Sequence, residues 1–166
     1  MEERPKIQLQ LSKLDKALEL MSKSVLVTML FLTAFVYINS PDVIPSHFNA
    51  SGKPDDFSDK SVIFILPLIG SVIYFGINQL VKFPNLFNYA ITITKENAQK
   101  QYELATRMIR FLQLAILIIF IVIILMTYLI IIDISDGLGE WFLPFALCVT
   151  SIPVIITLIQ SFKTKF

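Results

Sequence analysis

The chain has 166 residues, of which 55% are hydrophobic, with a mean hydropathy of +0.69 and a formal net charge of +1. A soluble domain of this length could not hide so much apolar surface in one core, so the excess must face lipid. The composition therefore excludes an ordinary soluble domain and predicts a small integral membrane protein. With one cysteine in the sequence, Cys148, an intrachain disulfide is also excluded.

Four apolar segments approach or meet the roughly 20 residues that a helix needs to cross about 30 Å of hydrocarbon. They predict an all-α membrane fold in a single domain, with spanning helices over residues 22–39, 62–81, 109–132 and 141–160. The third span is the clearest, because residues 111–132 contain no charged side chain.

The first span is the shortest, because its uninterrupted apolar run covers only residues 25–38. It reaches spanning length by including Leu20, Met21 and Lys23, whose long side chain can extend to the interface. The alternative is the apolar region of a signal peptide. The long charged segment before the run and the missing small-x-small pattern after Tyr37 favour a retained helix.

Lysine and arginine are distributed unevenly around these spans. Residues 1–23 carry five, residues 82–110 carry five and the tail carries two, whereas the two remaining loops hold only Lys53 and Lys60. Because cytoplasmic loops are enriched in lysine and arginine, this asymmetry predicts that both termini are cytoplasmic and that the loop over residues 40–61 faces outward.

The two outward loops are acidic. Their seven acids and two lysines give a formal charge of −5, and the acids are Asp42, Asp55, Asp56, Asp59, Asp133, Asp136 and Glu140. Such a face attracts cations or cationic peptides through its summed field. The alternative reading is that acids remain wherever topology excludes lysine.

The cytoplasmic segments carry helical patterns. Over residues 1–21, Leu11, Leu14 and Leu18 recur at three- and four-residue steps, which predicts an amphipathic helix on the inner leaflet. A partner helix or a second copy of the chain could cover the same face. Further on, Thr94 is a candidate cap for a helix over residues 95–132.

The outward loop over residues 40–61 holds the only histidine, His47. Its prolines restrict the backbone and residues 49–52 favour a tight turn, so we expect an ordered loop without regular secondary structure. The candidate ligand-binding residues are Pro41, Pro45, His47, Asn49, Gly52, Pro54, Asp55 and Asp56.

Catalysis and metal binding are weakly supported in this loop. A zinc site usually needs three or four protein ligands, so one histidine without a nearby thiolate predicts neither metal nor cofactor. His47 could act as an acid or base with Asp55 or Asp56, but no nucleophile motif or phosphate loop accompanies it, so we expect no enzyme. No ionisable residue lies at mid-span, which argues against a proton relay or a charged ion pathway. Transport by a chain of 166 residues would require oligomerisation to build a path.

The string Pro41-Asp42-x-Ile44-Pro45-x-His47-Phe48-Asn49-x-x-Gly52-x-Pro54-Asp55 lies directly between two predicted spans. It resembles the bacterial membrane family catalogued as domain of unknown function 1648. The later Phe87-Asn88-Tyr89 and Ile93-Thr94-x-Glu96-Asn97-Ala98, with Tyr102, are similar to that family's segment before the third span. Together the resemblance covers roughly residues 20–132.

This resemblance implies a bacterial cytoplasmic membrane protein. The family's better understood relatives are longer immunity proteins of the sporulation-delaying-toxin type, which protect a membrane from a secreted peptide. The resemblance thus implies an immunity-like module whose outer loop recognises an extracellular peptide. The alternative is a structural or accessory subunit docked on another membrane protein. Membrane lipid is the expected environment in either case. The sequence leaves the oligomeric state undecided, and we expect no nucleic-acid partner.

Overall fold

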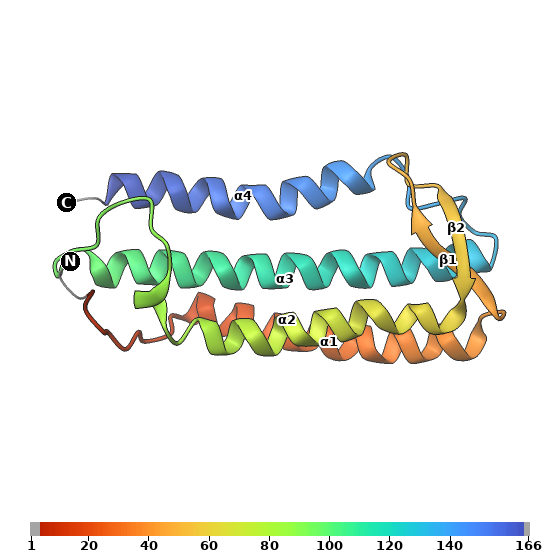
Figure 1. Ribbon diagram of the computed structural model, residues 1–166, viewed down its shortest axis with the longest axis horizontal. Helices are drawn as coiled ribbons and strands as arrows, with labels where there is room; N and C mark the ends of the chain where they lie inside the picture. Colours follow the sequence, from red (N-terminus) through yellow and green to blue (C-terminus); the bar gives the residue numbers. More distant parts are fainter. Residues whose placement is uncertain (1–3, 165–166) are drawn as a thin grey trace.

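The computed structural model describes residues 4–164 as a bundle of four long helices capped at one end by a small sheet (Figure 1). The helices and strands, in chain order, are α1 (Lys13–Asn39), β1 (Val43–Phe48), β2 (Pro54–Asp59), α2 (Ile65–Leu80), α3 (Ala98–Ile131) and α4 (Phe142–Lys163). Two short 3-10 helices, η1 (Lys60–Phe64) and η2 (Pro84–Leu86), flank α2.

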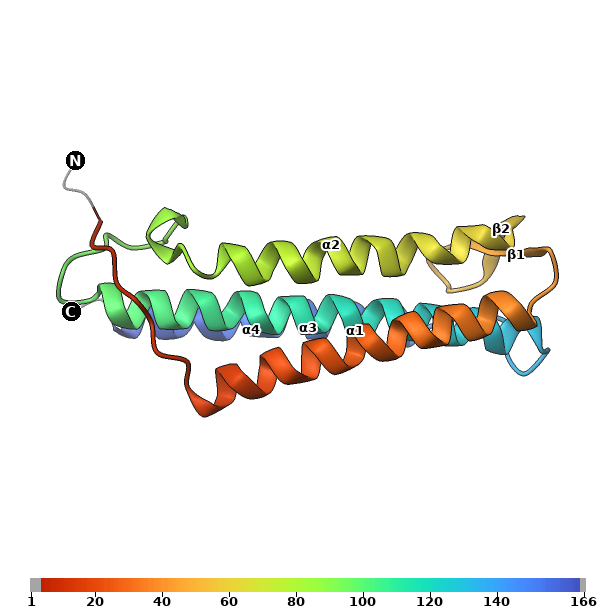
Figure 2. The ribbon, with the colours of Figure 1, turned by 90° about the horizontal axis from the view of Figure 1, so that it is seen from below.

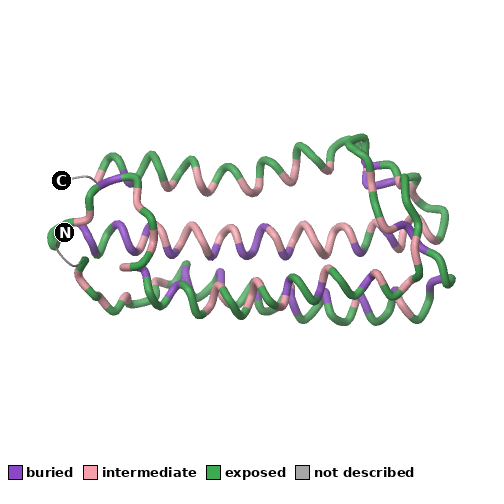
Figure 3. Tube along the Cα trace, viewed as in Figure 1, coloured by how far each residue is buried: buried purple, intermediate pink, exposed green. Residues whose placement is uncertain are grey.

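Four helical segments are long and apolar enough to cross a membrane. They are Lys13–Asn39, Lys60–Leu80, Ala98–Ile131 and Phe142–Lys163. The prediction of a mostly helical protein with four spans is therefore confirmed. The outward surfaces of these helices are mostly exposed in the isolated chain (Figure 3), and they include large apolar side chains such as Phe31 and Leu68. A lipid environment would cover this surface.

Helix α3 lies at the centre of the bundle. It packs against α1 and α2 on one side and α4 on the other (Figures 1 and 2). The buried apolar core runs between these helices and reaches the hairpin, and its members are Leu26, Met29, Val36, Ile44, Ile63, Leu117 and Ile124. Helix α4 contributes little to this core, since Ser161 is its one buried residue.

The bundle has two distinct ends (Figure 1). The β1–β2 hairpin and the loop between α3 and α4 lie at one end, called the hairpin end below. Residues 4–12 and the last turn of α4 lie at the other, called the terminal end.

The loop over residues 40–61 contains two β-strands, although the sequence predicted no regular secondary structure there. Strands β1 and β2 pair antiparallel within the predicted irregular loop over residues 40–61. The prediction missed them because Pro45 and Pro54 interrupt the usual strand signal.

The predicted amphipathic helix over residues 1–21 is also wrong over its described first half. Residues 4–12 contain no helix, and residues 1–3 lie outside the described part of the chain. Helix α1 begins at Lys13 because Ser12 and Asp15 form a reciprocal capping box, and it continues to Asn39. Residues 13–21 are therefore the first turns of a spanning helix rather than a separate element.

The predicted helix over residues 95–132 is shorter than expected, since α3 begins at Ala98. The side chain of Asn97 accepts a hydrogen bond from Thr94 N over 2.9 Å, and Asn97 N donates to Thr94 Oγ1 over 3.4 Å. Thr94 thus caps the turn that leads into α3 instead of α3 itself.

Candidate ligand-binding hairpin

Strands β1 and β2 of the hairpin place apolar and polar residues opposite each other. Ile44 is opposite Ser58, Pro45 is opposite Phe57 and His47 is opposite Asp56, with irregularities on both sides of His47. Because proline cannot donate a ladder hydrogen bond, a strand containing Pro45 is expected to bulge. The bulge places His47 at the most irregular point of the strand.

The turn between the strands is held by one side chain. Asn49 Oδ1 accepts hydrogen bonds from Ser51 N over 3.0 Å, from Ser51 Oγ over 2.7 Å and from Lys53 N over 3.1 Å. Asn49 N also donates to Lys53 O over 2.9 Å. The predicted turn is therefore confirmed, with Asn49 as its internal brace.

Gly52 joins this turn to the loop between α3 and α4. Its φ of 78° lies in the left-handed region that favours glycine. Gly52 O accepts a hydrogen bond from Leu138 N over 2.7 Å, and a Cβ at Gly52 would lie 2.8 Å from Gly139 O. The hairpin tip can approach the second loop this closely only because glycines face each other.

The base of the hairpin is anchored separately. Ile44 is 1% exposed and belongs to the core of the bundle. At the strand ends, Lys60 Nζ lies 3.1 Å from Asp42 Oδ1 and 5.3 Å from the centre of the Tyr37 ring. Asp59 Oδ1 accepts from Ser61 N over 2.8 Å, which starts η1. The hairpin is thus fixed at both its tip and its base.

The outward surface of the hairpin is polar and acidic. His47 Nδ1 lies 2.6 Å from Asp55 Oδ1, and the two side chains are 68% and 41% exposed. Asp56 and Phe57 are also exposed, and Phe57 is the large apolar side chain of β2. Hydrogen bonding from Ser61 lowers the pKa of Asp59, so this neighbouring carboxylate is charged at neutral pH.

The eight predicted site residues fall into two groups. Pro45, Asn49, Gly52 and Pro54 shape or seat the hairpin, and Pro41 leads into β1. His47, Asp55 and Asp56 lie on its exposed surface, where His47 and Asp55 contact each other. Within residues 4–164, no group of three or more His, Cys, Asp or Glu side chains is placed to hold a metal ion.

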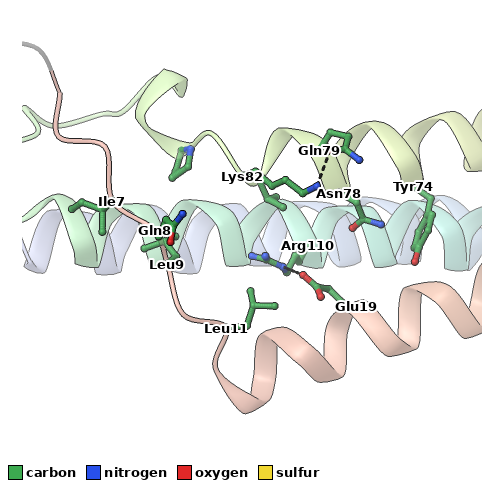
Figure 4. Close-up of a pocket in the computed structure, with 12 residues that line it drawn as sticks. Ile7, Gln8, Leu9, Leu11, Glu19, Tyr74, Asn78, Gln79, Lys82 and Arg110 are labelled. Atoms are coloured by element: carbon green, nitrogen blue, oxygen red, sulfur yellow. Dashed lines mark hydrogen bonds and ion pairs between the residues drawn. The ribbon is translucent and has the colours of Figure 1, made fainter.

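A second polar region, which the sequence reading missed, lies at the terminal end. Arg107 donates to both carboxylate oxygens of Asp15, from Nε over 2.9 Å and from Nη2 over 3.1 Å. One turn further, Arg110 Nε donates to Glu19 over 2.9 Å. Arg110 also lines a cavity of about 610 Å³ between α1, α2 and α3 (Figure 4). The paired residues are about 90 positions apart in the sequence, so no local sequence pattern predicts these ion pairs.

The fold and the hairpin define a class, that of multi-pass membrane proteins with an ordered cap on one end of the bundle. Residues 25–70 match the model of a family described as Domain of unknown function (DUF1648). The match covers the stretch from the middle of α1 through the hairpin into α2, and the predicted resemblance is confirmed there. The similarity noted over residues 87–102 lies beyond the match and stays a prediction. No curated protein and no solved structure matches the chain.

Proposed function

We propose that the protein is an immunity-like binding module of a bacterial cytoplasmic membrane, which captures a cationic extracytoplasmic peptide on its hairpin. Both termini lie in the cytoplasm in this proposal, as the distribution of lysine and arginine predicts. The proposal assigns binding and no catalytic step to His47 and its neighbours.

The observation that carries the proposal is the separation of roles within the hairpin. Ile44, Asn49 and Gly52 fix its position, whereas Asp55 and Asp56 are exposed and are not needed to seat it. A rigid acidic surface loses little conformational entropy when a ligand binds. Such a surface favours a cationic partner over an anionic one.

The exposed strand suggests how a peptide would bind. The sheet has two strands, so within the described residues β2 has no partner strand on its outer side. An extended peptide can add to such an edge through main-chain hydrogen bonds. Exposed Phe57 would offer an apolar contact beside Asp55 and Asp56, which suits a peptide with both basic and apolar side chains.

The test compares two double variants in cells deleted for the gene and challenged with membrane-active cationic peptides. Asp55→Asn with Asp56→Asn removes two hairpin charges but leaves the Asp59 cap of η1 intact. Glu96→Gln with Glu103→Gln is the matched control at the terminal end. We expect sensitivity at normal abundance for the hairpin variant alone. Equal protection by both variants would contradict the proposal.

An accessory subunit is the second candidate function. The observation in its favour is that α4 packs on α3 and buries one of its own residues, which leaves most of α4 exposed. Another membrane protein could use this surface as well as lipid does. Co-purification of a stoichiometric membrane partner, lost when α4 is altered and retained when the hairpin charges are removed, would favour this candidate.

A further inference from the structure

A cavity of about 610 Å³, drawn in close-up in Figure 4, opens at the terminal end of the bundle, and the hairpin lies at the opposite end (Figure 1). Figure 2 shows α1 and α2 diverging towards this end, while α3 lies behind them. The lining residues Glu19, Lys82 and Arg110 come from these three regions, and each lies within three residues of the boundary of a predicted span. The cavity therefore lies where the membrane's hydrocarbon meets its polar headgroups.

The charges that line the cavity do not cancel. Lys82 and Arg110 are cations and Glu19 is the single carboxylate among the lining side chains, so the formal charge of the lining is +1. A phosphodiester carries one negative charge and would balance it. A headgroup that adds its own cation would not.

Arg110 has unused hydrogen-bonding capacity. Its guanidinium donates from Nε to Glu19, and the structure gives neither terminal amino group a hydrogen bond within residues 4–164. The Arg110 side chain is 6% exposed, so its terminal amino groups are largely shielded from bulk solvent, and they point into the cavity (Figure 4). Arginine binds phosphate oxygens well because its donors form a planar fork.

The remaining lining is largely apolar. Ile7, Leu9 and Leu11 come from the segment before α1, and Val81 directly follows α2. That segment is held in place at its beginning, where Arg4 donates to Phe87 O and Tyr102 Oη donates to Pro5 O. The apolar wall extends the cavity beyond the volume that an inorganic phosphate needs.

We propose that this cavity binds an anionic phospholipid from the surrounding leaflet. The phosphate contacts the free donors of Arg110 and the ammonium of Lys82, and an acyl chain lies against Leu9, Leu11 and Val81. The site is independent of the hairpin ligand and needs only that the terminal end lies at one membrane boundary.

The experiment measures thermal unfolding of the full-length protein in a non-ionic detergent during titration with lipid. Phosphatidylglycerol, phosphatidylcholine with the same acyl chains and inorganic phosphate are the three probes. The variants are Lys82→Gln and Leu11→Trp, which remove a headgroup contact and fill the apolar part of the cavity. Lys100→Gln is the matched control, because this exposed lysine lies at the same end outside the cavity.

We expect phosphatidylglycerol alone to raise the unfolding temperature of the unaltered protein. Its half-saturating concentration should rise at least tenfold in Lys82→Gln and in Leu11→Trp and stay unchanged in Lys100→Gln. Equal responses to phosphatidylcholine would overturn the charge argument, and equal responses to phosphate would overturn the acyl-chain site. A response in Lys82→Gln that matches the unaltered protein would also overturn the proposal. Hairpin function can fail or persist independently of these results.

Discussion

Gly52 and Leu138 are joined by a backbone hydrogen bond of 2.7 Å, from Leu138 N to Gly52 O, across 86 positions of sequence. This bond links the hairpin tip to the loop between α3 and α4. Together with the buried Ile44 at the hairpin base, it makes the hairpin part of the bundle rather than a mobile appendage. The position of the exposed acidic surface therefore depends on the packing of two loops.

Gly137→Ala should loosen this contact. A Cβ at Gly137 would lie 2.3 Å from Gly52 O, a backbone atom that cannot move without shifting the hairpin. Gly137 does not have a positive φ, so the effect would be steric, and we expect destabilisation of about 1–3 kcal/mol. The measurement is unfolding in detergent.

Gly76→Ala is the control for that substitution. Nothing lies within 4 Å of a Cβ placed there, and Gly76 is inside α2, so alanine should leave stability unchanged or raise it by up to about 1 kcal/mol. Equal effects of the two substitutions would show that the loop contact contributes nothing.

Asn49→Ala should destabilise the hairpin turn, whereas Asn49→Asp should retain it. Alanine removes the acceptor that receives hydrogen bonds from Ser51 and Lys53, while aspartate keeps an oxygen at the same place. We expect a cost of about 1–2 kcal/mol for alanine, and faster amide hydrogen exchange over residues 49–53. An aspartate variant as exchange-labile as the alanine variant would contradict this role for the side-chain oxygen.

The hairpin base should weaken in acid through Asp59. Hydrogen bonding from Ser61 lowers the pKa of Asp59 in the folded protein relative to about 3.9 in an unfolded chain. A lowered folded pKa means that the stabilisation is complete above the unfolded value and is lost as pH falls through the folded pKa. Unfolding temperature followed from pH 6 down to pH 3 should therefore fall more steeply for the unaltered protein than for Asp59→Asn, whose amide also caps η1 but does not titrate. Parallel curves would exclude this contribution.

The spanning helices could be predicted from sequence because length and apolar content determine them directly. Residues 111–132 have no charged side chain, and a helix satisfies the backbone hydrogen bonds of such a segment within the segment itself. The exposed positions of His47, Asp55 and Asp56 could also be predicted, because polar side chains are concentrated between two spans, whereas their role in binding stays a prediction.

The hairpin pairing and its seating could not be predicted, because their causes are not local. Pro45 within β1 argues against a strand, and the strand forms because the buried Ile44 and the Asn49 turn outweigh that signal. Gly52 looks like a turn glycine, and its contact with Gly139 appears only when α3 brings the second loop beside it. The beginning of α1 was missed because the capping box of Ser12 and Asp15 was read as part of an amphipathic helix.

Arg107→Lys should cost more stability than Arg110→Lys, although both arginines pair α3 with α1. Arg107 donates to both oxygens of Asp15, whose side chain is 8% exposed, and Arg110 donates to Glu19 through Nε alone. Lysine can replace one directed hydrogen bond but not a planar pair, so the buried Asp15 would lose a partner at a cost of about 1–3 kcal/mol.

Unfolding of the two lysine variants in the same detergent checks this ranking. A double variant that combines Arg107→Lys with Asp15→Asn should lose less stability than the two single variants added together, because both substitutions act on the same interaction. If the two lysine variants have equal stability, the two parallel hydrogen bonds of Arg107 add nothing to the stability of the fold. The packing of α1 on α3 then depends on apolar contacts around Leu18 and Leu114 instead.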